Sequence, residues 1–141
     1  MTVSIELSVD RSLLLNMLSD GMDYACRGFW AQIEEYKWQW WYAGASDSVD
    51  NDKISPDLTD DTVLCRIRDD EDGMAEEEDR PFVDITIAKL EKAFGWVLQH
   101  YPHLLAPFET NSSGTIIDVD YDAIGADALI QRIVLGEITY G

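Results

Sequence analysis

The chain has 141 residues, 46% of them hydrophobic, and its 28 acidic and 10 basic residues give a formal net charge of −18. This size suits a single domain, residues 1–141, that buries its own core without metal or disulfide staples. The charge disfavours non-specific binding to nucleic acid and to anionic membranes, because both are polyanions. Two isolated cysteines and no apolar run of membrane-spanning length favour a reduced, cytoplasmic setting.

The first half of the chain shows strand and helix signals before a polar stretch. Residues 2–9 alternate apolar and polar side chains, which predicts a half-buried strand. Asp10 then suits the N-cap of a helix that ends near Gly21. Residues 24–42 hold eight of the fifteen aromatic side chains and favour a strand or a bent pair of strands, whereas residues 44–61 are rich in turn formers and predict a loop.

Two more strands are predicted on either side of an acidic run. Residues 62–68 and 80–87 both alternate, and residues 69–79 between them are acidic apart from Gly73, Met74 and Ala75. Self-repulsion of these carboxylates favours a solvated turn, so the two strands would form a hairpin. We expect the whole acidic region, about residues 44–79, to be flexible.

Helices dominate the remainder of the chain. Apolar residues between 90 and 98 recur at three- and four-residue spacing until Pro102 ends the helix, and one more short helical turn is expected within 103–108. Residues 111–114 read as a linker. Asp122 suits the cap of a last helix that ends near Gly136. The chain therefore predicts an α+β fold, a mainly antiparallel sheet of three to five strands with two or three helices packed on one face.

The acidic residues are concentrated in one stretch of the chain. Between Asp47 and Asp79, fourteen acidic residues face three basic ones, a net charge of −11. Closely spaced carboxylates on a hairpin imitate the phosphates of a nucleic acid and fit a groove lined by lysine and arginine. The alternative is a solvated loop that only aids solubility. The candidate partner-binding residues are Asp60, Asp61, Asp69, Asp70, Glu71, Asp72, Glu76, Glu77, Glu78 and Asp79.

A tryptophan-rich segment is the second candidate surface. Trp38, Trp40 and Trp41 could stack a nucleobase or anchor a protein interface, where tryptophan is enriched. Trp40 and Trp41 would point to opposite faces of a strand. Core packing is the alternative, and we favour it for most of the aromatic residues.

Three aspartates have a spacing that superficially suggests a calcium loop. Asp118, Asp120 and Asp122 fall at alternate positions, but the sixth and twelfth positions of an EF-hand loop require Gly and Glu. Here they are Ala123 and Leu129, so we predict no metal site.

The sequence also lacks a catalytic motif. His100 and His103 have no nucleophile or second metal ligand close by in sequence, and they suit contacts with the carbonyl groups at a helix end. No phosphate-binding glycine loop, serine elbow or zinc-protease motif is present. We therefore expect a binding protein, not an enzyme, with no cofactor.

Three stretches carry a resemblance to known proteins: D-Y-A-C-R-G-F-W, then I-A-K-L-E-K-A-F with H-Y-P-H-L-L-A-P-F, and the terminal Y-D-A-I-G-A-D-A-L-I-Q-R-I-V-L-G-E-I-T-Y-G. Over about half the chain they resemble a family of small uncharacterised proteins encoded by bacteriophages, prophages and conjugative elements, while residues 44–79 depart from it. The resemblance implies an accessory protein of a mobile element inside a bacterial host. In the terminal stretch, the features shared with that family fall on Asp122, Ala126, Asp127, Gln131, Gly136, Glu137, Tyr140 and Gly141.

Such accessory proteins are frequently inhibitors of host defence. The favoured hypothesis is therefore an anti-CRISPR or anti-restriction inhibitor in the host cytoplasm, whose partner is a basic surface of a host protein or nuclease complex. One alternative is a sponge for a nucleotide immune signal, which stacks on the aromatic segment. Few basic residues are at hand to bind its phosphates: Arg27, Lys37, Arg66, Arg68, Arg80 and Arg132. The other alternative is a structural accessory protein with no defence target.

Overall fold

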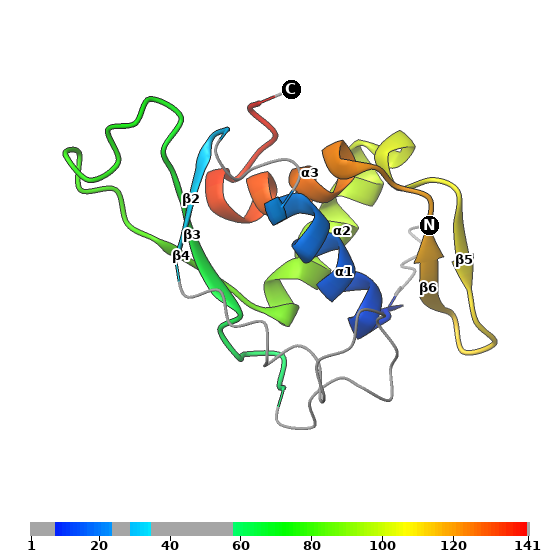
Figure 1. The fold of residues 1–141 in the computed structure, drawn as a ribbon. Coiled ribbons are helices and arrows are strands. Elements are labelled where there is room, and N and C mark those ends of the chain that lie inside the picture. The colour runs from blue at the N-terminus through cyan, green and yellow to red at the C-terminus, as the bar shows by residue number, and fades with distance from the viewer. Residues whose placement is uncertain (1–7, 24–28, 35–57, 141) are drawn as a thin grey trace, which may run out of the picture.

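The computed structural model describes residues 8–23, 29–34 and 58–140, which fold into three central helices flanked by two small sheets (Figure 1). The fold is α+β, as predicted, but the strands are divided between two sheets of three strands each instead of forming one. The helices are α1 (Arg11–Gly21), α2 (Ile87–His100) and α3 (Ala123–Leu135), with a short 3-10 turn, η4 (Pro102–Leu105). The strands are β1 (Ser8–Val9), β2 (Ala31–Glu34), β3 (Cys65–Asp69), β4 (Val83–Ile85), β5 (Phe108–Thr110) and β6 (Thr115–Val119).

The first sheet has the order β2-β3-β4 and is antiparallel throughout. Ile67 at the centre of β3 lies opposite Ile33 on one side and Val83 on the other. This pairing confirms the hairpin predicted around the acidic run. Strand β2 supplies a strand within residues 24–42, as expected, although residues 24–28 and 35–42 lie outside the described part of the chain.

The second sheet has the order β1-β6-β5, with β1 parallel and β5 antiparallel to β6. The β5–β6 turn covers the expected linker 111–114, where the Asn111 side chain accepts hydrogen bonds from the backbone of Ser113 and Thr115. Gly114 follows with a φ of 82°, which favours glycine. The sequence prediction gave no strand at β5, because its three exposed residues show no alternation.

Helix α1 begins and ends where the sequence predicts. Asp10 occupies the N-cap position, although its carboxylate accepts from the hydroxyl of Ser12 and makes no cap bond to the backbone. The helix ends at Gly21, where a Cβ would come within 2.7 Å of Ile130 and 3.0 Å of the Ala126 carbonyl oxygen. This close approach brings α1 against α3.

Capping side chains also delimit α2 and α3. The Thr86 hydroxyl accepts a hydrogen bond from the first turn of α2, and the helix ends at His100, just before Pro102, as predicted. Asp122 caps α3 by accepting from a backbone N–H of the first turn. Gly136 ends the helix in the left-handed conformation, with φ at 81°.

The core is built mainly from the helices. The buried side chains of the core come from all three helices, from both sheets and from segments between them. Among the described helices none is long and apolar enough to cross a membrane. The largest buried side chains include Trp30, Phe94, Leu14, Leu15, Met17, Leu18, Met22, Leu64, Ile67, Ile85 and Ile87.

Candidate functional site

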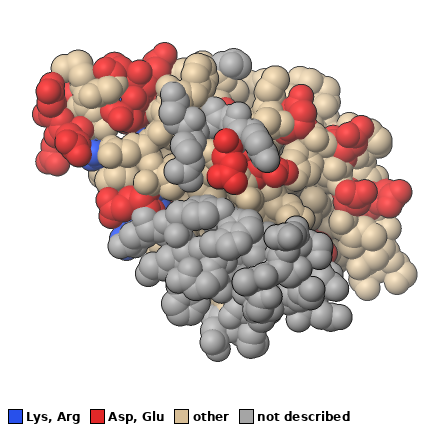
Figure 2. Space-filling view, viewed as in Figure 1, with Lys and Arg blue, Asp and Glu red and all other residues tan. Residues whose placement is uncertain are grey.

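The acidic loop, residues 69–79, connects β3 to β4 and extends away from the helices at one end of the molecule (Figure 1). It carries eight acidic residues and no basic one. Figure 2 shows the acidic side chains gathered at this end. Eight of the ten acidic residues predicted to bind a partner therefore lie together on one projecting loop.

Short aspartate side chains build the turns of the acidic loop. The Asp69 carboxylate accepts from the backbone N–H of Glu71, and that of Asp70 accepts from Ala75 at 3.0 Å. Asp72 accepts from Met74 in the same way. Side chains of this length favour such local backbone bonds, so part of the negative charge shapes the loop itself.

Arg80 ties the two sides of the loop together. Its guanidinium group donates to the Asp72 carboxylate at 2.7 Å and to the carboxylate of Glu78, and it lies 3.9 Å from that of Asp69. The hydrogen bond that Arg80 donates to Asp72 lowers the pKa of Asp72, and the same bond raises the pKa of Arg80. Residues 69–80 together keep a net charge of −7, eight carboxylates against one guanidinium.

Arg68 anchors the base of the loop to the sheet. Its side chain is only 8% exposed and donates to Gln32 on β2 at 2.7 Å and to the Arg80 carbonyl oxygen at 3.2 Å. The guanidinium group also lies 4.4 Å from the ring centre of Phe82, a favourable cation–π contact. Arg68 on β3 therefore fixes the base of the loop to β2 and to the segment that precedes β4.

The outer surface of the loop combines negative charge with one apolar side chain. Glu71, Glu76, Glu77 and Asp79 are exposed, and Met74 is 42% exposed although it is apolar. Glu76 lies 3.8 Å from the buried Arg68, a long ion pair whose carboxylate is 83% exposed. An exposed methionine among carboxylates gives the loop an apolar contact point beside its charges.

Two aromatic side chains, Tyr140 and Phe29, lie together at the base of the loop, and the sequence prediction missed this arrangement. The Tyr140 hydroxyl donates to the Asp69 carboxylate at 3.1 Å, and its ring lies edge-on to Phe29 at 6.3 Å. Phe29 is 54% exposed. Because these residues are far apart in the sequence, only the fold brings them beside the acidic loop.

The remaining two predicted acidic residues lie elsewhere. Asp60 and Asp61 precede β3, whereas the acidic loop follows its other end, so the strand separates the two groups. Asp60 binds the Arg11 side chain at 2.7 Å and accepts a backbone hydrogen bond from Ala88. This position gives Asp60 a structural contact instead of a place on the loop.

The predicted aromatic surface, Trp38, Trp40 and Trp41, lies outside the described residues. Trp30 is described and belongs to the core, where its indole N–H donates to the Asp127 carboxylate at 2.9 Å. Core packing, the reading favoured for most of the aromatic residues, is confirmed for this one.

Three residues of the terminal stretch, Asp127, Gln131 and Tyr140, take part in a largely buried hydrogen-bond network. Gln131, 1% exposed, donates to the Asp127 carboxylate at 2.6 Å and to the Tyr140 carbonyl oxygen at 2.9 Å. Its own carbonyl oxygen accepts from the backbone of Thr139 and Tyr140, both at 2.8 Å. The Tyr140 ring stacks on Trp30 at 5.7 Å. These residues therefore fix the last segment of the fold.

Burial sets the ionisation of two groups in this network. Burial raises the pKa of Asp127, although hydrogen bonds from Trp30 and Gln131 oppose the shift. Desolvation, with the neighbouring carboxylates of Asp69 and Glu71, raises the pKa of Tyr140 to about 12. Tyr140 thus connects the core network to the acidic loop as a neutral hydrogen-bond donor.

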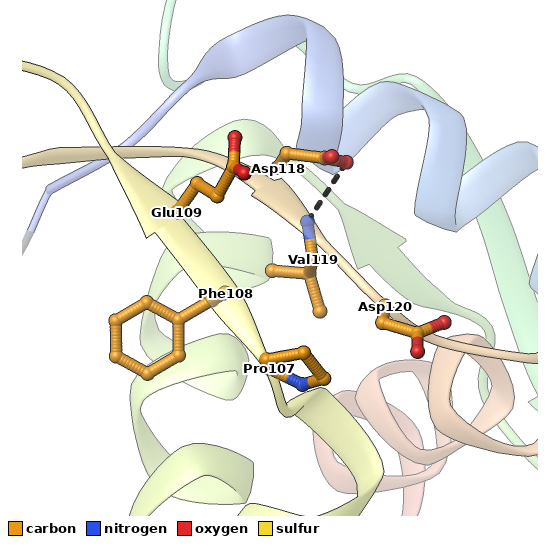
Figure 3. A pocket seen from close by; sticks show the side chains of 6 residues that line it. All are labelled: Pro107, Phe108, Glu109, Asp118, Val119 and Asp120. Atoms are coloured by element: carbon orange, nitrogen blue, oxygen red, sulfur yellow. Dashed lines mark hydrogen bonds between the residues drawn. The ribbon is translucent and has the colours of Figure 1, made fainter.

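A pocket of about 430 Å³ opens on the second sheet (Figure 3). Glu109 and Asp118 lie beside each other there, with Phe108 and Val119 farther along the two strands. The Asp118 carboxylate accepts from the backbone N–H of Val119, and the part of the chain that the structure describes contains no group of three side chains suited to a metal ion. The pocket is lined by Pro107, Phe108, Glu109, Asp118, Val119 and Asp120.

The two histidines flank Pro102, with His100 at the end of α2 and His103 in the short turn that follows. His100 contacts the Trp96 carbonyl oxygen at 2.9 Å through Nδ1 and stacks on the Trp96 ring at 4.5 Å. His103 lies in η4, edge-on to Tyr101. The expected contact between a histidine and a helix carbonyl is confirmed for His100.

Comparison of the chain with protein-family models, with curated proteins and with solved structures finds no match.

Proposed function

We propose that the protein binds a basic surface of another protein through the acidic loop. In this proposal it is an accessory protein of a mobile element that acts in the cytoplasm of a bacterial host. Its partner is a nuclease or guide complex of a host defence system, which makes the protein an inhibitor of the anti-CRISPR or anti-restriction type. The observation that carries the proposal is the concentration of eight carboxylates on one projecting, internally bonded loop.

The internal bonds of the loop favour recognition over simple solubility. Charge that serves only solubility needs no fixed geometry, whereas here aspartate side chains, Arg80 and Arg68 hold the turns in place. Preorganisation lowers the conformational entropy lost on binding. The exposed carboxylates of Glu76, Glu77 and Asp79 are then presented on a fixed frame.

A basic groove for nucleic acid is the partner that matches this surface. Such a groove is lined by lysine and arginine side chains that bind phosphates, and a cluster of carboxylates competes for the same charges. Long-range attraction also raises the association rate at low salt. Met74 and Phe29 supply exposed apolar contacts that nucleic acid lacks, and these would favour the inhibitor over the natural ligand.

The test compares two variants of equal net charge. The loop variant is Glu76→Gln, Glu77→Gln and Asp79→Asn. These side chains make no turn-forming or Arg80 bond described above, and the contact of Glu76 with Arg68 is long, at 3.8 Å. The control variant is Glu91→Gln, Glu109→Gln and Glu137→Gln, three exposed glutamates outside the loop. Each set removes three negative charges, so both proteins change from −18 to −15.

Each protein serves as bait in a bacterial lysate at low and at high salt, and recovered partners are measured by direct binding. We expect the loop variant to bind about tenfold more weakly at low salt, and binding of the unmodified protein to fall steeply with salt. The control variant should keep its affinity. Equal loss in both variants would leave net charge as the cause, and unchanged binding in the loop variant would refute the proposed site.

Inhibition of defence is measured separately by phage plaquing on hosts that carry a CRISPR or a restriction system and express each protein. We expect the unmodified protein and the control variant to restore plaquing and the loop variant not to do so. Partner binding without restored plaquing would refute the anti-defence role and leave the binding surface standing.

A further inference from the structure

A pocket of about 340 Å³ between α2 and α3 gathers three positively charged side chains. The chain holds only ten basic residues against 28 acidic ones, so three cations around one pocket form a marked local reversal of charge. The pocket is lined by Lys89, Lys92, Ala93, Arg132, Ile133 and Gly136.

Arg132 is held in place by two contacts. Its guanidinium group lies 4.3 Å from the ring centre of Trp96, and one of its N–H groups donates to the Gly136 carbonyl oxygen at the end of α3. A guanidinium group has five N–H donors, so this bond leaves others for a ligand. The stacking on Trp96 limits the conformations of the side chain, and a ligand therefore costs less entropy to bind.

The two lysines come from the first half of α2. The Lys89 ammonium donates to the Asp84 carbonyl oxygen at 2.8 Å and keeps two more hydrogens, while Lys92 is exposed one turn later. The dipole of α2 adds positive potential at Lys89 in its first turn, whereas the C-terminal end of α3 at Gly136 adds negative potential, so the three cations set the charge of the pocket. The acidic residues next to the lining residues in sequence, Glu91 and Glu137, are exposed and well solvated.

We propose that this pocket binds a small phosphate-bearing anion. A phosphomonoester dianion has three terminal oxygens that accept hydrogen bonds, so it can bond the planar fork of Arg132 and a lysine ammonium group at the same time, whereas a carboxylate has only two oxygens. The volume admits a small organic group as well, which would contact Ala93 and Ile133.

The net charge of the protein selects a small anion over a polyanion. Fixed charges farther away than the Debye length, about 8 Å at physiological ionic strength, are largely screened from a ligand in the pocket. A small anion therefore senses mainly the three nearby cations. A nucleic acid would extend beyond the pocket over the surface of a protein that has 28 acidic residues and only ten basic ones.

The 141-residue protein, labelled with ¹⁵N, is titrated with inorganic phosphate and, separately, with glycerol 3-phosphate, against sodium chloride at matched ionic strength. We expect saturable shifts of the backbone signals of Lys92, Ala93 and Ile133 and of the Trp96 indole signal. Tighter binding of glycerol 3-phosphate would assign the site to phosphomonoesters. Equal binding of the two ligands would assign it to free phosphate. Absence of saturable shifts at these residues with both ligands would overturn the proposal.

The Lys92→Gln variant removes an exposed cation and should weaken binding at least about fivefold, the loss of one charge-assisted hydrogen bond. Arg11→Gln changes the net charge equally but lies outside the pocket, and it should leave the affinity unchanged. Equal weakening in both variants would attribute the effect to net charge and overturn the proposal. Because the acidic loop contributes no lining residue, this test is independent of partner binding.

Discussion

Gln131 is the residue whose replacement tests the buried network most directly. The substitution Gln131→Leu keeps a similar volume and helix propensity but removes four hydrogen bonds, two donated by the side chain and two accepted by it. It also deprives the buried Asp127 carboxylate of one of its two side-chain donors.

The expected loss follows from these contacts. Each hydrogen bond contributes about 1 kcal/mol net to stability, so the four together contribute about 4 kcal/mol, and the loss of a donor to the buried carboxylate adds a further cost. Detachment of residues 139 and 140 would let water satisfy their backbone groups and would reduce the cost. We therefore expect the free energy of unfolding to fall by about 2–4 kcal/mol, a large part of the stability of a typical domain.

Urea unfolding at pH 7, followed by circular dichroism, measures the loss, and hydrogen exchange at the amides of Thr139 and Tyr140 reports the detachment. Gln99→Leu is the matched control, because Gln99 is exposed on α2, and it should change stability by less than about 0.5 kcal/mol. A loss below about 1 kcal/mol for Gln131→Leu, with both amides still protected, would refute the reasoning.

Three further predictions concern ionisation and close packing. Burial raises the pKa of Asp127 in the folded state above its ordinary value of 3.8. At pH values between the unfolded and the folded pKa, the folded state therefore binds more protons than the unfolded state, and it loses stability as the pH rises through this range. The stability of Asp127→Asn relative to the unmodified protein should thus increase from pH 4 to pH 7 in urea unfolding, and a constant or falling difference would contradict this. Gly125→Ala should lower the free energy of unfolding by about 1–3 kcal/mol, because the new Cβ would lie 2.7 Å from a backbone oxygen. Gly95→Ala, on the open surface of α2, should raise it by about 0.5–1 kcal/mol. Similar changes in stability for both variants would contradict the close contact at Gly125. Arg80→Gln should raise the pKa of Asp72 towards 3.8 in an NMR titration, and an unchanged pKa would show that the ion pair does not form in solution.

The elements that the sequence predicts well are those set by local contacts. The cap at Asp122, the left-handed Gly136 and the end of α2 before Pro102 depend only on neighbouring residues, and the structure confirms them. The β3–β4 hairpin is predicted for the same reason, since both strands alternate and an acidic turn joins them. Local signals of this kind also gave the α+β class.

The division of the strands into two sheets depends on pairing between distant residues. Ser8 lies opposite Thr115 in the parallel β1–β6 pair, and no feature near either residue in sequence indicates its partner. Strand β5 has three exposed residues and a register shift between Glu109 and Thr110, so it offers no alternation to detect. Such pairings follow from tertiary packing.

Sequence composition located the acidic loop, but it could not separate the roles of its carboxylates. The pairing of Asp72 with Arg80, the hydrogen bond from Tyr140 to Asp69 and the exposure of Phe29 all arise from the fold. Trp38, Trp40 and Trp41 stay a prediction, because they lie outside the described residues.

Five carboxylates of the acidic loop form two sets that differ in how readily they can be substituted. Asp69, Asp70 and Asp72 hold backbone turns, so most substitutions there would alter the path of the chain. Glu76 and Glu77 point to solvent from that path, so they can be exchanged for other residues at little cost to folding. In the proposed binding role, the loop is thus suited to acquire new partner specificities by mutation, because the residues proposed to contact the partner can change without altering those that hold the shape of the loop.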